Sequence, residues 1–191
     1  MHEIEKRLLT GILLFDGAWG TMLMERGMKA GDIAEKWILD RPDDIAAVHK
    51  MYFDAGADIV TTATLGASSP KLAHYGLADR ATEINRRGAE LATGVRPPGK
   101  FVAGDIGSTG KLLPPAGNAD EKALAEAFTA QAFALAEGGV DLFIIETMID
   151  VREALIALKA AKSTGLAVFV TISFAKKPRG YFTISVLASS G

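Results

Sequence analysis

Two acidic residues stand where apolar runs of the sequence stop. Residues 12–15 are apolar and end at Asp16, and residues 142–145 are apolar and end at Glu146. A strand that is covered on both faces is continuously apolar, so each run is expected to place a carboxylate at the tip of a buried strand. Two carboxylates on the same rim of a sheet would form a pocket for a cationic group.

The loop after Asp16 offers the opposite kind of binding. It contains Gly17 and Gly20, and a glycine-shaped turn leaves backbone N–H groups free to face an anion. Simpler interpretations stay open: Asp16 is also the residue type that forms turns or caps a helix after a strand, and the glycines can merely shape that turn. Glu146 is harder to explain in this way, because a glutamate directly after four apolar residues is costly to bury without a partner.

Composition limits the class of protein. The chain has 191 residues, of which 49% are hydrophobic, so one domain with one sizeable core is expected. The 21 Lys and Arg nearly balance the 23 Asp and Glu, and without a basic cluster we expect no nucleic-acid partner. No apolar stretch approaches the roughly 18 residues of a membrane span, which favours a cytoplasmic protein. Cysteine is absent, so this chain supplies no disulfide, thiolate ligand or cysteine nucleophile.

Short apolar runs alternate with longer helical patterns, which is typical of a parallel sheet with crossover helices. The expected strands are residues 12–16, 57–62, 101–105, 142–146 and 168–173. The expected helices are residues 42–55, 79–93, 123–137 and 150–165, although Gly88 weakens the second of them. A doubly wound sheet and a (βα) barrel both fit this order. Acids about 130 positions apart favour the barrel, because its rim collects the carboxyl ends of all strands.

Several phrases of the sequence, taken in order, resemble one family, that of the homocysteine S-methyltransferases. This is the barrel domain found in cobalamin-dependent methionine synthase and in betaine:homocysteine methyltransferase. The phrases are DGAWGT at residues 16–21, AGADIV at 55–60, KLAHYGL at 71–77, GDIGSTG at 104–110 and GVDLFIIETM at 139–148.

The resemblance implies transfer of a methyl group to the sulfur of homocysteine, which forms methionine. It also implies a zinc ion that holds this sulfur as a thiolate, because a free thiol with a pKa of about 8.5 is a poor nucleophile at neutral pH. The implied methyl donor is a corrinoid protein or a folate-charged corrinoid, and a betaine or sulfonium compound also stays open.

In this family the zinc ligands are cysteines on strands beyond the fifth, whereas this chain has no cysteine and ends at Gly191, after the fifth expected strand. We therefore expect an incomplete TIM-type barrel of about five of the eight βα units. Residues 1–191 would be a homocysteine-binding domain that is truncated before the C-terminal strands. We expect that the isolated chain is unstable, that it oligomerises, or that a second polypeptide completes the barrel.

The resemblance also implies an amino-acid site. Asp16 and Glu146 would bind the ammonium group of homocysteine, and the backbone around Gly17, Ala18, Gly20 and Thr21 would face its carboxylate. Thr62 belongs to the same rim. The family's Thr-Asn-Thr-Phe stands here as residues 62–65 with the sequence TATL, so the rim lacks an amide and an aromatic side chain.

Two other functions stay open. The chain can be a non-catalytic amino-acid-binding fragment or subunit that keeps the two acids but performs no chemistry. It can also be an unrelated barrel enzyme that uses Asp16 and Glu146 as general acid and base.

Overall fold

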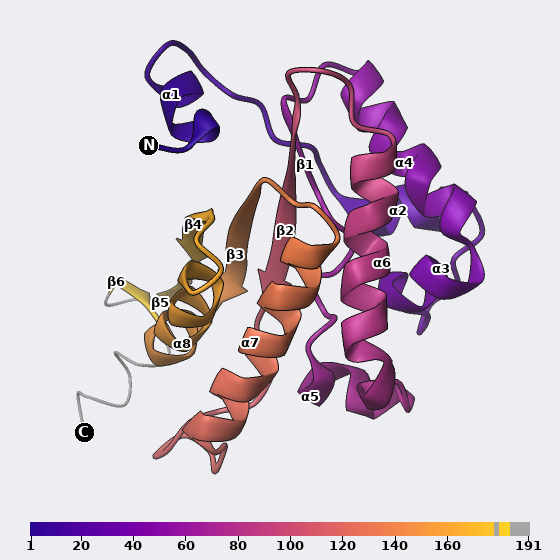
Figure 1. Ribbon diagram of the computed structural model, residues 1–191. Helices are drawn as coiled ribbons and strands as arrows, with labels where there is room; N and C mark the ends of the chain where they lie inside the picture. Colours follow the sequence, from indigo (N-terminus) through magenta and orange to yellow (C-terminus); the bar gives the residue numbers. More distant parts are fainter. Residues whose placement is uncertain (178–179, 184–191) are drawn as a thin grey trace.

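A parallel sheet of four strands, which follow one another in chain order, forms the centre of the molecule (Figure 1). The computed structural model describes residues 1–177 and 180–183. The strands are β1 Ile59–Thr61, β2 Phe101–Gly107, β3 Leu142–Met148 and β4 Ala167–Ile172. Each strand pairs in parallel with the next, and helices connect them. This succession of βα units is the arrangement from which (βα) barrels are built.

The run at residues 12–16 reaches the sheet but does not form a full strand. Phe15 makes a single parallel bridge with Ile59, and the N–H group of Asp16 donates to the carbonyl oxygen of Ile59 at 2.9 Å. Ile12 is 88% exposed, so the beginning of the run lacks the cover that a buried strand requires. The predicted first strand was therefore too long, although Asp16 still stands beside β1.

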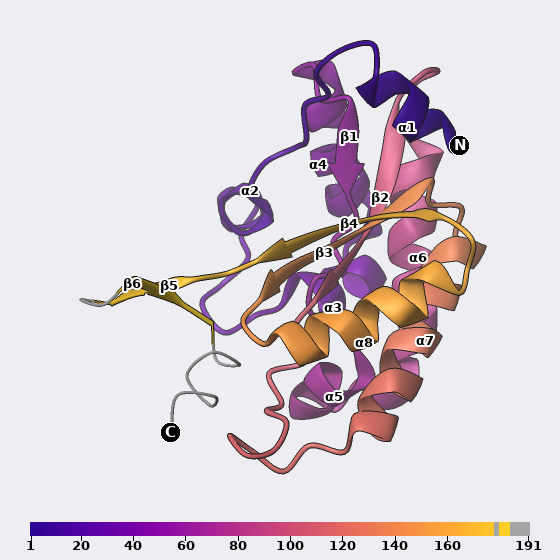
Figure 2. The same cartoon turned by 90° about the vertical axis from the view of Figure 1, so that its left-hand side faces the viewer.

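A hairpin that we did not predict follows β4. β5 Ala175–Lys177 pairs antiparallel with β6 Gly180–Phe182, and Figure 2 shows both standing away from the four-stranded sheet. The strand expected at residues 168–173 is β4, which begins and ends one residue earlier.

Four long helices cover one side of the sheet (Figure 1), and they confirm the four that we predicted. They are α4 Pro42–Asp54, α6 Ala81–Gly94, α7 Glu121–Glu137 and α8 Val151–Lys162. Asp120 and Asp150 cap α7 and α8 by accepting hydrogen bonds from the backbone two residues later, at 3.0 and 2.8 Å. The shorter elements were not predicted: α1 Glu3–Leu8, α2 Trp19–Glu25, α3 Ala34–Asp40, α5 Ser69–Leu72, and the 3₁₀ turns η1 Ala73–Tyr75 and η2 Ala78–Arg80.

The two faces of the sheet have different cores. Side chains alternate along a strand, so Val102 and Phe143 face the helices, where they are fully buried in the larger core. Phe101 and Leu142 point to the other face and pack with Ile4 of α1, which is 1% exposed. We call this the inner face of the sheet. Helix α1 covers it at the end where the strands begin.

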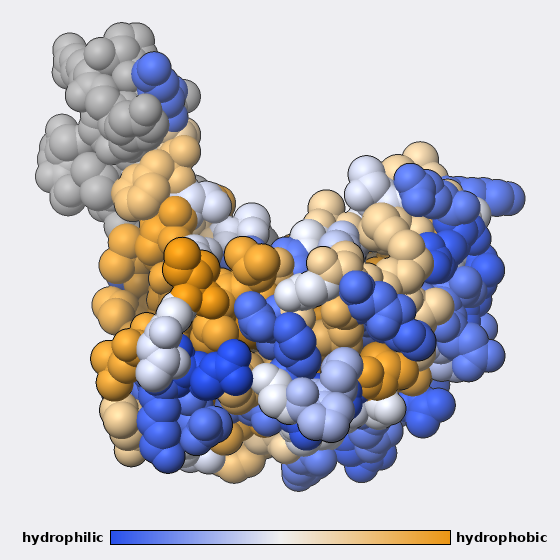
Figure 3. Space-filling view, turned by 90° about the horizontal axis from the view of Figure 1, so that it is seen from above, coloured by the Kyte–Doolittle hydropathy of each residue, from blue (hydrophilic) through white to orange (hydrophobic). Residues whose placement is uncertain are grey.

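The inner face is open on one side. Phe15 near one edge of the sheet is 38% exposed, and Phe169 of β4, whose ring meets it edge-on, is only partly buried. Figure 3 shows, from above, a hollow between two parts of the molecule with hydrophobic side chains gathered on one of its sides. Within residues 1–177 and 180–183 the sheet does not close on itself: residues 14–16 bridge to the outer edge of β1, and the outer edge of β4 is of the kind that pairs with a further strand.

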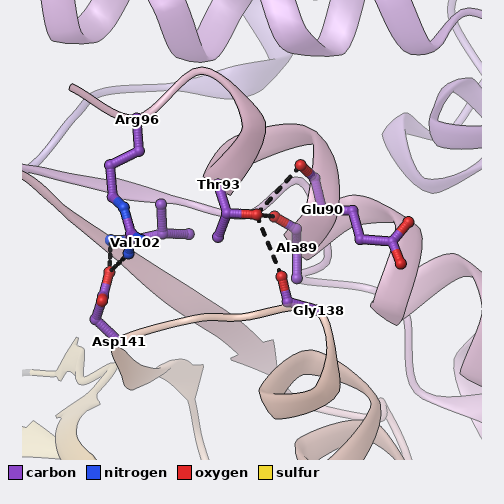
Figure 4. Close-up of polar contacts among 7 residues, drawn as sticks. All are labelled: Ala89, Glu90, Thr93, Arg96, Val102, Gly138 and Asp141. Atoms are coloured by element: carbon purple, nitrogen blue, oxygen red, sulfur yellow. Dashed lines mark hydrogen bonds and ion pairs between the residues drawn. The ribbon is translucent and has the colours of Figure 1, made fainter. Parts of the chain in front are cut away.

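A group of polar contacts fastens the covering helices to the sheet (Figure 4). The Thr93 hydroxyl at the end of α6 donates to the carbonyl oxygen of Gly138 at 3.2 Å, as well as to carbonyls of its own helix. One carboxylate oxygen of Asp141 accepts from the Arg96 guanidinium at 2.5 Å and from the N–H group of Val102 at 2.7 Å. The carboxylate thereby holds the start of β2 and the end of α6 against the turn before β3.

Replacing this carboxylate by an amide should destabilise the fold. We expect Asp141→Asn to lower the free energy of unfolding by about 1–3 kcal/mol, because one charge-assisted hydrogen bond is lost and the Arg96 charge is left unpaired. Urea denaturation measures this change. The matched control is Asp54→Asn, which breaks an exposed pair with Lys50 and should cost under about 0.5 kcal/mol. Equal losses in the two variants would contradict the prediction.

Candidate functional site

A cavity of about 490 Å³ opens at the carboxyl ends of the strands. Four carboxyl groups line it, from Asp16, Glu35, Asp105 and Glu146, and none of its lining residues is Lys, Arg or His. The structure therefore brings Asp16 and Glu146 to one place, together with two acids that the sequence analysis had not assigned to the site. This cavity is suited to a cationic group rather than to an anion.

Asp16 is held at the wall of the cavity by β1. Its carboxylate accepts hydrogen bonds from the N–H group of Thr61 at 2.9 Å and from the Thr61 hydroxyl at 3.2 Å. Burial nevertheless raises the pKa of Asp16 to about 7, since the Thr61 hydrogen bonds oppose the rise only in part and the negative charge of Glu146 adds to it. Near neutral pH, this carboxyl group is therefore close to the midpoint of its titration.

Glu146 lies in β3, two residues before the end of the strand, and it is partly buried. The pairing of β3 with β4 is irregular between Ile145 and Met148, and Thr147 has a φ of 57°, a left-handed conformation that is rare for a β-branched residue. The irregularity directly follows the acid. We had expected the strand to end at Glu146, but it continues past this distortion to Met148.

The loop after Asp16 turns into a helix sooner than expected. Gly17, Ala18 and Gly20 line the cavity, and α2 begins at Trp19, whereas Thr21 is exposed and does not line it. The first N–H groups of a helix have no partner within that helix, so donors are available at this wall. Trp19 also lines the cavity and packs edge-on against the His49 ring, with 4.6 Å between ring centroids.

Thr62 lies in the cavity wall, and its hydroxyl is occupied by the protein itself. It accepts a hydrogen bond from the N–H group of Asp105 at 2.9 Å and shares a second one with the Thr64 hydroxyl at 2.6 Å. Thr64 in turn donates to the carbonyl oxygen of Asp105 at 2.8 Å. The two threonines hold the backbone of Asp105, while Ala63 and Leu65 complete the rim.

Glu35 was missed by the sequence analysis. It comes from α3, is 9% exposed, and accepts a hydrogen bond from the N–H group of Gly66 at 2.6 Å. Burial raises its pKa, with the Gly66 hydrogen bond and the charge of Lys71 acting in the opposite direction. No strand-end pattern marks Glu35, because only the packing of α3 against the loop after β1 brings it to the cavity.

Asp105 was also missed, although its signal was present. It follows four residues of an expected strand, as Asp16 and Glu146 do, and it lies in β2 with 3% of its surface exposed. The same pattern that singled out the other two acids could have found it.

The family follows from comparison with known sequences. The sequence model of the family described as homocysteine S-methyltransferase matches residues 13–185. The chain belongs to the homocysteine S-methyltransferase family. Methionine synthases from Mycobacterium leprae (strain TN) and Mycobacterium tuberculosis (strain ATCC 25618 / H37Rv) are 32% identical over 171 residues and 33% identical over 173 residues. These matches cover 83% and 84% of this chain but 14% of each relative.

Solved structures support the assignment of the chain to a (βα) barrel fold. The homocysteine methyltransferase MmuM from Escherichia coli, in its metallated form, superposes with a TM-score of 0.76 at 24% identity, over 91% of this chain and 67% of that one. Its oxidized form gives 0.74 at 26% identity, over 88% of this chain and 64% of that one. The sheet and its helices thus have the fold of part of a (βα) barrel.

The zinc ion that the resemblance implies does not fit the residues present. The chain has no cysteine, and residues 1–177 and 180–183 contain no group of three His, Cys, Asp or Glu side chains that could hold a metal ion. The four acids of the cavity therefore call for another explanation than metal binding. None of the helices in the described part of the chain combines the length and apolarity that a bilayer crossing requires.

Proposed function

We propose that the chain forms the homocysteine-binding part of a homocysteine S-methyltransferase and that the acidic cavity holds the amino-acid head group. The observation that carries the proposal is the meeting of Asp16 and Glu146 in a cavity whose lining has no basic residue. A cation 4 Å from one carboxylate gains about 4 kcal/mol at an effective dielectric constant of 20, so two carboxylates can offset its desolvation. A neutral cavity could not do so.

The ligand carboxylate would lie against the loop that follows Asp16. Gly17, Ala18 and Gly20 stand at the beginning of α2, where backbone N–H groups are available. Thr21 does not line the cavity and is assigned no contact, whereas Thr62 would keep the rim in shape through its hydrogen bonds. The sulfur end of the ligand would extend along the open side of the cavity.

The methyl chemistry itself would need groups from outside this sequence. Zinc would activate the sulfur as a thiolate, held by residues that this chain does not contain, and the methyl donor would be a corrinoid or a folate-charged corrinoid. Since the chain spans 14% of the methionine synthases that it matches, a corrinoid-carrying domain is a natural partner. A non-catalytic binding fragment or subunit is the second candidate, since the acidic cavity would bind an amino acid without chemistry.

Isothermal titration calorimetry tests the head-group assignment. We expect the chain to bind L-homocysteine under reducing conditions and to bind 2-hydroxy-4-mercaptobutanoate at least about tenfold more weakly, because this analogue has a hydroxyl in place of the ammonium group. Added zinc should leave both affinities unchanged for the chain alone. Equal binding of the two compounds would contradict the proposal, and so would the absence of homocysteine binding. Methyl transfer by the lone chain would contradict the assignment of the chemistry to other residues.

A further inference from the structure

Asp105 is the most deeply buried acid of the cavity, and the proposed function gives it no role. Its Oδ1 atom is buried and has no hydrogen-bond partner within the described residues. Thr62 and Thr64 hold its backbone on both sides, through its N–H group and its carbonyl oxygen. A buried polar atom left without a partner at the wall of a cavity is the place where a ligand atom would complete the hydrogen bonding.

The surroundings of Asp105 are negative. Asp105 is paired with Ile144 across β2 and β3, and Glu146 lies two residues further along on the same face of the sheet. Asp16 beside β1 and Glu35 on α3 line the same cavity, while Lys71 lies near Glu35. A fully buried carboxylate beside other carboxylates is costly in its charged form, so the neutral acid is favoured.

The pKa of Asp105 follows this expectation. Burial raises it well above the usual 3.8, and the charges of Glu146, Asp16 and Glu35 and a hydrogen bond with the Glu146 carboxyl all act in the same direction. Asp105 is therefore the acid of the cavity at which a proton is retained most strongly.

We propose that Asp105 is a third member of the head-group site, a neutral carboxylic acid whose O–H donates to the Glu146 carboxylate and whose Oδ1 accepts a hydrogen bond from the ligand's ammonium group. This inference rests on the proposed function. A neutral Asp105 lowers the electrostatic repulsion among the four acids of the cavity. Its O–H orients the Glu146 carboxylate and leaves the charge of Glu146 available for the ligand. The preferred ligand is then a primary ammonium group, which has enough N–H donors for Asp16, Glu146 and Asp105 together.

Two substitutions separate the neutral acid from a charged one. Asparagine has the shape of the neutral acid, with an N–H donor for Glu146 and an Oδ1 acceptor for the ligand, so Asp105→Asn should bind L-homocysteine within about threefold of the wild type at pH 7. Asp105→Ala removes both groups and should weaken binding at least about tenfold. Calorimetry on the same chain measures both, and Asp54→Asn serves as the surface control. A loss in Asp105→Asn as large as that in Asp105→Ala would overturn the inference while leaving the proposed function standing.

The pH dependence of stability gives a readout that needs no ligand. The folded state keeps a proton on Asp105 that the unfolded state releases above about pH 4, so rising pH destabilises the wild type through this group. Asparagine carries no such proton. The melting temperature of Asp105→Asn minus that of the wild type should therefore increase by a few degrees between pH 5 and pH 8. A constant difference between the two proteins over this range would overturn the neutral-acid assignment.

The two experiments fail in different ways. If the wild type does not bind L-homocysteine, the proposed function is wrong, and the ligand contact of Asp105 is wrong with it. If the wild type binds but the asparagine variant behaves like the alanine variant, only the role of Asp105 is wrong.

Discussion

Replacing Asp16 by asparagine is expected to weaken L-homocysteine binding by about a hundredfold at pH 8, which makes it the largest single effect on the site. Asparagine can still accept the hydrogen bond from the Thr61 backbone, so the wall of the cavity should stay in place. What is lost is one of the two negative charges that offset the desolvation of the ammonium group. Truncating one partner of a buried charge pair costs about 2–5 kcal/mol, and a hundredfold loss lies within that range.

The pH dependence of this effect follows from the pKa of Asp16, which is about 7. If the ionised form binds the cation, homocysteine affinity of the wild type should fall by about tenfold for each pH unit below 7 and level off above it. A bound ammonium group lowers this pKa, so binding at pH 6 should release a proton, which calorimetry in buffers of different ionisation enthalpy detects. In Asp16→Asn the dependence due to this group disappears.

The control for Asp16→Asn is Glu25→Gln, which removes an exposed charge at the end of α2 that does not line the cavity. It should change the affinity by less than about threefold, since exposed charges are screened by water and salt. Two results would count against the role of Asp16: equal effects of the two variants, or an affinity of Asp16→Asn that still falls about tenfold per pH unit below pH 7.

A second large effect is expected on stability, at a glycine inside α6. A Cβ atom at Gly88 would lie 2.7 Å from the Cγ2 of Thr64 and 3.0 Å from the Cδ1 of Ile38. Both neighbours are fully buried, and the Thr64 hydroxyl is fixed by its hydrogen bonds. We expect Gly88→Ala to destabilise the fold by about 1–3 kcal/mol through overpacking, even though alanine is the better helix former.

Gly94 provides the matched control because it ends the same helix and a Cβ atom there would meet nothing within 4 Å. Gly94→Ala should be neutral or stabilise the fold by up to about 1 kcal/mol, since it lowers the entropy of the unfolded chain. Chemical denaturation of the two variants gives the comparison. A Gly88→Ala variant that is as stable as Gly94→Ala would contradict the close packing of α6 against Ile38 and Thr64.

Gly88 also shows why some of the fold could be predicted and some could not. Within the sequence it only weakens a helical pattern, and its reason, the approach of Ile38 and Thr64, lies in parts of the chain that are distant in sequence. The four long helices and four of the strands were predictable because apolar periodicity and glycine stops are local signals. The first strand was predicted too long, since an apolar run does not reveal that Ile12 has nothing to cover it.

The site shows the same division. Asp16 and Glu146 could be selected because an acid at the end of an apolar run is a local pattern, and the order of the strands then brings them to one rim. Asp105 carries the same pattern and should have been selected with them. Glu35 could not be, because α3 reaches the cavity only through the packing of the loop after β1 against it.

All four acids of the cavity come from residues 16–146, that is, from successive early units of the fold. Under the proposed function, one stretch of polypeptide would choose a substrate by its amine and a separate stretch would transform that substrate at its sulfur. Such an arrangement would allow the reactive segment to change in evolution while the amino-acid-binding segment is kept. It would also allow ligand binding to be measured in the absence of turnover.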